Sequence, residues 1–413
     1  MNTNMLRKRK RAGSSLVLVV VIVVALLVTG GGLLSLGLQG RMQGIRAGSE
    51  MKARSAADAG LTAALARMNR MLETRTWSQS ELVDSDVSGT LPNSGTTFNY
   101  DIAATGESLK KPEFTVTSVS RVRQMHAGVS AVVALKGLFE SAILAQQRIS
   151  LSPGSTVDGF NSADPTDTDA DLKMGTLSTV ADSIPIGPGT LINGDVFVGV
   201  GGDPGTVIGA GGTITGGTYP LIIEPEQPVI TIPPLPNIGT ALDAKGTTIE
   251  LTPAASGTYS SITLGQASGV SGILEITGGQ VKLHITGNID LGQGCELIID
   301  PDSSLILYVD GDIRADNSGG LNNQAGDIKA FQIYATGGTE QTFDLKAKSR
   351  IFGTIYAPQA NITIYPNAEI CGAIVGKNVL FKSGCTFYYD EALRDVSIEE
   401  EGVRFVVARW REY

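Results

Sequence analysis

The chain has 413 residues, 51 glycines, 18% charged residues and a formal net charge of −9 at pH 7. Residues 1–13 hold five cations and no acid, which leaves −14 for the rest and argues against nucleic acid as a partner. Two histidines and three scattered cysteines, without Cys-x-x-Cys or His-Glu-x-x-His spacing, predict no metal site and no cofactor. Many glycines and few charges favour a repetitive β architecture.

The first element is a basic leader over residues 1–13, containing "RKRKR", followed by an uncharged apolar run over residues 14–38. As a helix these 25 residues would be about 38 Å long, against about 30 Å for the hydrocarbon core of a bilayer. A cleavable secretory signal has a shorter apolar core of about 7–15 residues. Because flanks rich in Lys and Arg stay in the cytoplasm, we predict a single-pass protein of the inner (cytoplasmic) membrane. Its N-terminus is then cytoplasmic, and its C-terminal bulk is periplasmic or at the cell surface.

The helical pattern continues beyond the apolar run. Leu61, Leu65, Met68 and Leu72 recur at i, i+4, i+7 and i+11, which places them on one helical face. We therefore predict one helix over residues 14–72, with a membrane span over 14–38 and an amphipathic second half. Three consecutive glycines at 30–32 weaken this helix by up to about 1 kcal/mol each and favour a bend there.

The boundary at Gly13 and Ser14 resembles the class III leader that prepilin peptidase cuts after glycine. Residues 5–72, including "RSAADAGLTAALARMN", resemble the PilX N-terminal domain of type IV pilus assembly proteins. The resemblance implies that prepilin peptidase cleaves between Gly13 and Ser14. It also implies that the membrane and other pilin-like subunits contact the apolar anchor residues, which are Leu16, Val17, Leu18, Val21, Ile22, Val24, Leu26 and Leu27.

One position departs from the pattern of major pilins. Those proteins carry a glutamate at the fifth mature position, which is thought to pair with a neighbouring subunit's amine, whereas cleavage after Gly13 puts Leu18 there. By resemblance to minor pseudopilins that also lack the glutamate, Leu18 favours an initiating, capping or accessory subunit over a repeating one.

Residues 73–148 follow the helix and are predicted to form a small β-rich domain. Polar residues with turn signals leave the helix, and apolar and polar residues then alternate from Phe98 to Arg148, as in "FTVTSVSRV". Such alternation is typical of strands with one buried face. We expect a small antiparallel sheet that covers the amphipathic face of the helix.

Residues 149–395 are predicted to form a β-solenoid, because short β runs punctuated by glycine recur through this region. Residues 353–371 and 372–390 are adjacent 19-residue units, and "GNIDL" at 287 and "GDIRA" at 311 open alike 24 residues apart. Residues 219–240 are rich in proline, which lacks the amide donor of a ladder, and favour an extended strap. The predicted fold class is therefore α+β, mainly β.

The end of the chain carries a second resemblance. "FYYDEALRD", followed by a strand within residues 396–413 that ends in Trp410-Arg411-Glu412, is similar to exported PilX-like proteins with a bactofilin-like β-helical C-terminal domain. The resemblance implies that the Tyr-Asp-Glu-Ala-Leu turn closes the last coil of the solenoid.

The cysteines fall at two kinds of position. Cys295 and Cys385 align with Ser303 and Ala368 in a small-x-apolar pattern, which predicts a small inward slot. Cys371 lies three residues past Ala368, so strand alternation turns it outward. This offset argues against a bridge between Cys371 and Cys385.

Clustered aspartates are the remaining candidate chemistry. Asp164, Asp167, Asp169 and Asp171 alternate as calcium ligands do, but Leu172 stands where an EF-hand loop needs glycine, so we interpret the segment as a solvated loop. Asp300, Asp302, Asp310 and Asp312 are compatible with a carbohydrate-active site, yet they adjoin turns, where Asp is favoured for backbone reasons. The glycine-rich strings lack the features of a phosphate loop.

From these features we predict a membrane-anchored, minor-pilin-like structural component of a type IV pilus or related filament that presents a β-solenoid outside the cytoplasm. It is not expected to be an enzyme. The first alternative is a surface or periplasmic anchor-plus-solenoid protein that never enters a filament, such as an adhesin. The second is a carbohydrate-active β-solenoid enzyme. The sequence identifies no surface ligand.

Overall fold

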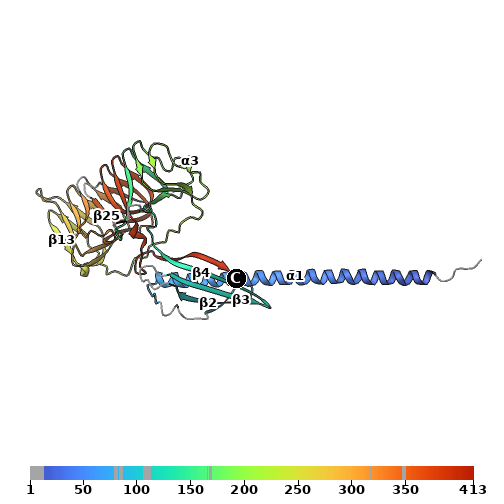
Figure 1. The fold of residues 1–413 in the computed structure, drawn as a ribbon. Coiled ribbons are helices and arrows are strands. Elements are labelled where there is room, and N and C mark those ends of the chain that lie inside the picture. Colours follow the sequence, from blue (N-terminus) through green and yellow to red (C-terminus); the bar gives the residue numbers. More distant parts are fainter. Residues whose placement is uncertain are drawn as a thin grey trace, which may run out of the picture.

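The computed structural model describes residues 14–78, 82, 87–105, 113–164, 166, 170–316, 319–346 and 350–413. The predicted leader over residues 1–13 lies outside them. The molecule has three parts, which are a long helix, a small β-sheet packed on the second half of that helix, and a large stack of short strands beyond it (Figure 1). We call the second part the head and the third part the stack. The predicted class, mainly β with one long N-terminal apolar helix, is confirmed.

Helix α1 (Ser14–Glu73) runs without a break through Gly30, so the expected bend is absent from this described helix. Its second half is buried against the head, but the centre of the buried face differs from the prediction. Leu61 and Leu65 are only half-buried. The fully buried positions are mostly small residues that let the sheet approach closely, namely Ala53, Ala56, Ala57, Gly60, Ala64 and Met68.

The head sheet is antiparallel and follows the order β1-β2-β3-β4-β28 within the described chain. Its last strand comes from the C-terminus and pairs with β4 from Arg404↔Lys136 to Glu412↔Val129. The head is therefore completed only after the chain has passed through the whole stack. Its strands are β1 (Val87–Thr90), β2 (Thr97–Ala104), β3 (Glu113–Val122), β4 (Met125–Lys136) and β28 (Arg404–Glu412).

The C-terminal strand also completes the core of the head. Phe405 is buried between Phe114 and Trp77, with ring centroids at 5.4 and 5.0 Å. Asn69 of α1 holds the same residue by its backbone: Asn69 Nδ2 donates to the Phe405 carbonyl (3.1 Å), and the Phe405 amide donates to Asn69 Oδ1 (2.7 Å). The side-chain amide of the helix thus takes the place of a neighbouring strand.

The stack is built from two chain segments whose strands pair in parallel. The first segment contains β5 (Ile143–Leu151), β6 (Thr156–Phe160), β7 (Lys173–Thr176), β8 (Leu191–Ile192), β9 (Asp195–Val198), the short helix α3 (Pro204–Val207), β10 (Thr213–Ile214) and β11 (Thr218–Pro220). The predicted domain boundary at residue 149 falls inside β5, because the alternation used to place it does not distinguish antiparallel from parallel partners.

The second segment contains 16 strands between residues 242 and 390. They are β12 (Leu242–Lys245), β13 (Thr248–Leu251), β14 (Gly257–Tyr259), β15 (Ile262–Gly265), β16 (Ile273–Ile276), β17 (Gln280–Ile285), β18 (Ile289–Leu291), β19 (Glu296–Ile299), β20 (Ser304–Val309), β21 (Ile313–Ala315), β22 (Gly320–Asn323), β23 (Phe331–Ala335), β24 (Gln341–Leu345), β25 (Arg350–Ile364), β26 (Glu369–Phe381) and β27 (Thr386–Asp390). Two 3-10 turns of the described chain lie between these strands, η1 (Pro253–Ala255) and η2 (Ile328–Ala330), and a third, η3 (Glu391–Arg394), follows β27.

Buried aliphatic columns hold the layers of the stack together. In one column each side chain is the register partner of the next, so apolar residues lie over one another through eight layers. The strands alternate between buried and partly exposed residues, so the column lies on their inner face. The column consists of Leu242, Ile262, Ile289, Ile313, Phe343, Ile362, Val379 and Ile149, all of them buried.

The two segments are not stacked in chain order. β26 pairs with β25 on one side and with β5 on the other, so the last coil of the second segment lies directly on the first coil of the first. The chain enters the stack at β5, winds outward to β11, returns to β12 at the opposite end, and winds back to its entry point. We call the contact between β26–β27 and β5–β6 the seam.

Residues 221–241 make this return and contain no strand. Fully extended, these 21 residues reach about 65 Å, more than the roughly 48 Å from β12 to β11, which is the eight-layer column and the three further layers at β7, β9 and β11. Midway, the Pro228 carbonyl accepts a hydrogen bond from Tyr356 Oη (2.8 Å), and Gln146 Nε2 donates to Gln227 Oε1 (2.9 Å). This segment, which we call the strap, therefore runs along the outside of the stack.

Candidate functional site

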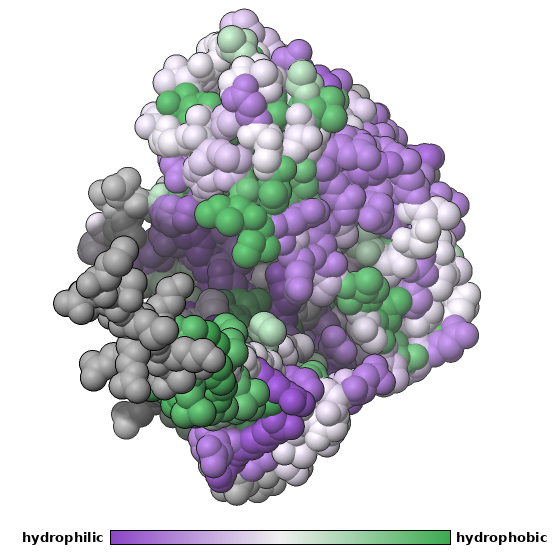
Figure 2. Space-filling view, turned by 90° about the vertical axis from the view of Figure 1, so that its right-hand side faces the viewer, coloured by the Kyte–Doolittle hydropathy of each residue, from purple (hydrophilic) through white to green (hydrophobic). Residues whose placement is uncertain are grey.

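The first half of α1 presents an apolar surface that no described part of the chain covers. The predicted anchor residues are all exposed, from 75% for Leu16 to 49% for Ile22, and they lie on every side of the helix. By length and composition the helix is able to cross a membrane. Figure 2 looks along the helix from its N-terminal side and shows a compact hydrophobic cluster beside a larger, mostly hydrophilic body. The predicted cleavage site is not placed, because Gly13 lies outside the described residues and Ser14 is the first residue of α1. The exposed anchor residues are Leu16, Val17, Leu18, Val21, Ile22, Val24, Leu26 and Leu27.

A ladder of tyrosines on the outer face of the stack joins it to the head. Tyr308, Tyr334 and Tyr356 are register partners on β20, β23 and β25, and they alternate with the core residues of those strands. The ring centroid of Tyr334 lies 5.7 Å from that of Tyr308 and 6.5 Å from that of Tyr356. Phe139, in the linker between β4 and β5, packs on Tyr356. All three are buried although they face away from the core of the stack, because the two segments that link the stack to the head, residues 137–142 and 396–403, cover them together with the strap.

Glu401 connects the tyrosine ladder to the end of α1. It lies between η3 and β28, accepts a hydrogen bond from Tyr308 Oη (2.7 Å), and forms an ion pair with Arg75. The neighbouring Glu400 pairs with Lys329 of η2 (2.9 Å). Burial, followed by the hydrogen bond to Glu401, raises the pKa of Tyr308 far above its ordinary value, so this hydroxyl is held as a donor.

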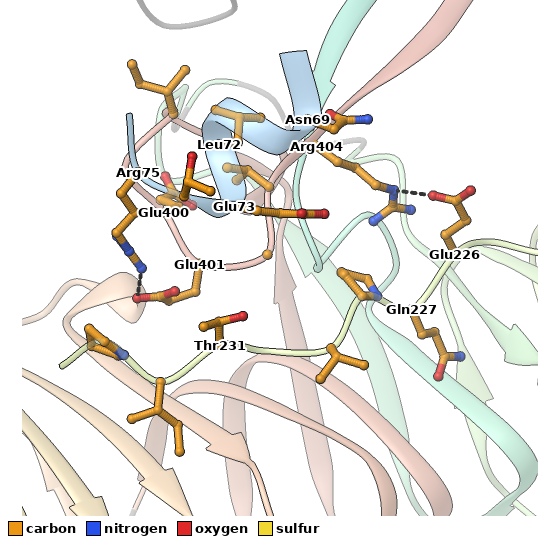
Figure 3. A pocket seen from close by; sticks show the side chains of 18 of the residues that line it. Asn69, Leu72, Glu73, Arg75, Glu226, Gln227, Thr231, Glu400, Glu401 and Arg404 are labelled. Atoms are coloured by element: carbon orange, nitrogen blue, oxygen red, sulfur yellow. Dashed lines mark ion pairs between the residues drawn. The ribbon is translucent and has the colours of Figure 1, made fainter. Parts of the chain in front are cut away.

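We call the contacts of Glu401 with Tyr308 and Arg75 the joint. A groove of about 730 Å³ opens beside it, between the end of α1, the strap and residues 398–404 (Figure 3). Its apolar floor comes from the strap, and its walls carry Glu73, Arg75 and Arg404. Arg75 pairs with Glu401, and Arg404 Nε lies 3.3 Å from a carboxylate oxygen of Glu226 but has no hydrogen-bond partner among the residues that the structure describes. The described residues that line the groove hold no arrangement of nucleophile and base. The first ion pair fixes the end of α1 to the segment before β28, and the second fixes β28 to the strap.

The candidate catalytic aspartates do not converge. Asp300 and Asp302 lie in the turn before β20, whereas Asp310 and Asp312 follow that strand, so about 20 Å of strand separates the two pairs. Asp310 accepts hydrogen bonds from Thr336 Oγ1 (2.7 Å) and contacts His284 Nε2 (2.9 Å). Asp312 accepts from the Thr342 amide (2.9 Å). Both link neighbouring coils.

The predicted acidic loop is described only in part, since Asp167 and Asp169 lie outside the described residues. Asp164 accepts two hydrogen bonds from Thr166, which lower its pKa. Asp171 pairs with Lys173 (2.8 Å) and with Arg394 of η3 (3.1 Å), across the seam. In the described chain, no three His, Cys, Asp or Glu side chains are grouped to hold a metal ion.

All three cysteines are buried in the stack. Cys295 and Cys385 are fully buried with Ala368 and Ser303, as the small inward slot predicts. Cys371 faces the other way, but it too is buried, between its register partners Phe352 and Tyr388. None of the three cysteines, all of which lie in the described chain, forms a disulfide.

The comparisons with known proteins are limited. Residues 240–396 match a family described as a domain of unknown function (DUF7305), which covers less than half of the chain. No curated protein matches. Among solved structures, the competence-associated pilin ComZ from Thermus thermophilus is similar at 13% identity, over 88% of this chain and 97% of that one, with a TM-score of 0.22.

An ice-binding protein from the Antarctic ascomycete Antarctomyces psychrotrophicus is similar at 15% identity, over 60% of this chain and 93% of that one, with a TM-score of 0.25. At these scores neither likeness supports an inference about fold or function.

Sequence reasoning missed the tyrosine ladder and its link to Glu401. A signal was present, because Leu307-Tyr308-Val309, Ile333-Tyr334-Ala335 and Ile355-Tyr356-Ala357 repeat one apolar-Tyr-apolar pattern. Their spacings of 26 and 22 residues match the coil lengths of this region. A large aromatic residue repeated on the outward side of a coil predicts that another part of the molecule covers that side.

Proposed function

We propose that the protein is a membrane-anchored, minor-pilin-like structural component of a type IV pilus or related filament, presenting an acidic β-solenoid outside the cytoplasm. The observation that carries this proposal is the division of α1. One continuous helix has an uncovered apolar first half and a second half packed on an antiparallel sheet. About 38 Å of apolar helix is stable only in lipid or among similar helices, which supports an anchor that also packs against neighbouring subunits.

The proposed role is positional and not catalytic. Most charged groups near the groove are engaged with one another, and Asp310 and Asp312 hold neighbouring coils together. We also propose that prepilin peptidase processes the chain between Gly13 and Ser14. That processing would free the helix to enter a filament from the membrane.

Mass spectrometry of the mature amino terminus tests the processing step. The full chain is expressed with and without a prepilin peptidase, beside the variants Gly13→Ala and Gly40→Ala. We expect a chain beginning at Ser14 only when the peptidase is present, with Gly13→Ala left intact and Gly40→Ala processed normally. An intact Met1 in the presence of active peptidase, or cleavage near Gly40, would remove the pilin proposal.

A second candidate is a surface or periplasmic anchor-plus-solenoid protein that never enters a filament. The sequence has no carboxylate between Ser14 and Glu50, so the helix offers no acidic partner to a neighbouring amine. A photo-crosslinking amino acid at Val21 separates the two candidates. Adducts with pilin subunits support the filament, and adducts with lipid alone support the fixed anchor.

A further inference from the structure

Charge is divided unevenly along the molecule. Residues 39–136 and 404–413, which include the head and its part of α1, hold 15 Lys and Arg against 10 Asp and Glu. Residues 137–403, which form the stack and its linkers, hold 12 against 31. The head therefore carries a net charge of +5 and the stack −19. The basic part lies next to the apolar anchor and the acidic part lies farther from it (Figure 1).

Four exposed arginines lie at the end of the head and of its part of α1 that is nearest the anchor. Arg41 and Arg46 follow the apolar run on α1, and Met42 and Ile45 between them extend its exposed apolar surface. The turn between β3 and β4 adds Arg121 and Arg123, since Arg121 pairs with His126 across the hairpin. We call these four arginines the basic collar. In the described chain none of them forms an ion pair.

The fold brings the hairpin to the level of the first uncovered turns of α1. Gly60 lies against Ser118 of β3, and Val122 is four residues further along that strand, or about 13 Å toward the anchor. That distance corresponds to about nine helical residues, which places the hairpin turn beside residue 51 of α1. Figure 1 shows the hairpin pointing along α1 toward its N-terminal end.

From these positions we infer that the basic collar docks on anionic phospholipid headgroups of the leaflet from which α1 emerges. The inference rests on the membrane anchor of the proposed function. Arg41 and Arg46 lie roughly 5 and 12 Å beyond Leu38 along the helix, so they reach the headgroup layer. The hairpin arginines extend toward the same layer from beside the helix.

Two further points favour lipid as the partner. Flanks on the non-cytoplasmic side of a membrane span are ordinarily poor in Arg and Lys. Arginines this close to the span depart from that pattern, which favours a role for them at the membrane surface. An anionic membrane surface attracts the basic collar and repels the acidic stack. The head is therefore held against the membrane, and the stack is held away from it. A second copy's acidic stack is the alternative partner for the collar.

Energy transfer from the hairpin to lipid headgroups tests the inference. The exposed Gln124 is replaced by cysteine in the full chain and labelled, and the unsubstituted chain, whose cysteines are buried, gives the background. The protein is reconstituted in vesicles of phosphatidylcholine alone or mixed with phosphatidylglycerol, each carrying a headgroup-labelled lipid. We expect stronger transfer on the anionic vesicles, and loss of the difference at high salt.

Variants identify the residues involved. Arg121→Ser with Arg123→Ser is expected to lower the ratio of docked to undocked heads roughly 30-fold, at about fivefold per cation. Arg314→Ser, which removes an exposed arginine of the stack, is expected to change nothing. The inference is overturned by equal transfer on both vesicles, or by transfer that follows protein density and not anionic lipid, which would identify a second copy as the partner. A chain that floats with neither vesicle overturns the membrane anchor as well.

Discussion

The head and the stack are both β-structures, but their strands find partners in different ways. In the stack most partners are one coil apart, from 17 residues for Ile370↔Phe387 to 35 for Thr156↔Leu191. In the head, β4 pairs with β28, which follows the entire stack in the sequence. The stack is thus largely a sum of local pairings, whereas the head depends on one distant strand.

This difference predicts how much of the structure a substitution or deletion destabilises. A change in one coil is expected to act on that coil and its neighbours, because each layer touches only the next. A change in β28 acts on the whole head, whose core and last strand it supplies. The joint at Glu401 and the tyrosine ladder decides whether the two parts respond together.

Deleting residues 404–413 is expected to have the largest effect. Loss of Phe405 alone costs about 3–5 kcal/mol, which approaches the whole stability of a small domain. Hydrogen exchange should show β2, β3 and β4 unprotected while β17 and β20 keep their protection. Trp410→Ala, at an exposed position of the same strand, should stay within about 0.5 kcal/mol of the parent. A protected head in the truncated chain would contradict the dependence.

Alkaline pH is expected to open the joint. Burial raises the pKa of Tyr308, Tyr334 and Tyr356 above the ordinary value of 10.0. The unfolded chain therefore loses these protons first, and stability that is complete below pH 10 falls above it by about 1.4 kcal/mol per tyrosine per pH unit. Tyrosinate absorbance and proteolysis of residues 396–403 should rise together above pH 10. Opening at lower pH would show that other groups control the joint.

Glu401→Ala is expected to loosen the joint without unfolding either part. The substitution leaves the Tyr308 hydroxyl buried without its acceptor and removes the ion pair with Arg75, at a cost of about 2–3 kcal/mol. Proteolysis of residues 396–403 measures the loosening. Glu399→Ala, in the same segment but exposed, is the matched control and should behave as the parent. Equal effects of the two variants would remove Glu401 from this role.

Substitutions of two glycines in α1 have the smallest expected effects, and the two effects have opposite signs. A Cβ at Gly60 would lie 2.1 Å from Ser118 Oγ and 2.8 Å from Phe98, so Gly60→Ala should destabilise the head by about 1–2 kcal/mol. Gly48 has open space around its Cβ position, and Gly48→Ala should stabilise α1 by about 0.5–1 kcal/mol. Thermal unfolding in detergent measures both. Shifts of the same sign would contradict the close packing of α1 on β3.

Much of the architecture could be predicted from local patterns. Periodicity placed the end of the helix at residue 72, and α1 ends at Glu73. The 24-residue offset between "GNIDL" and "GDIRA" is the register of Ile289↔Ile313, and the 19-residue offset is that of Ile351↔Ile370. In each case the repeat reports a pairing between consecutive coils, which is why sequence alone reveals it.

The order of the coils and the candidate site could not be predicted in the same way. Val379 packs on Ile149 as Ile362 packs on Val379, and nothing in these aliphatic residues marks one contact as the seam. Glu401 and Arg75 lie more than 300 residues apart and resemble ordinary surface charges in sequence. Their role depends on the distant return of β28 to the head, which no local pattern encodes.

The seam has a consequence for biosynthesis. The coil edge at β5 is made some 220 residues before β26, the strand that caps it, so the growing chain carries an open parallel edge until β26 has been synthesised. During that interval the edge is able to accept β26 from any copy made nearby. Such an exchange would yield intertwined dimers, which would first accumulate where many copies are synthesised close together.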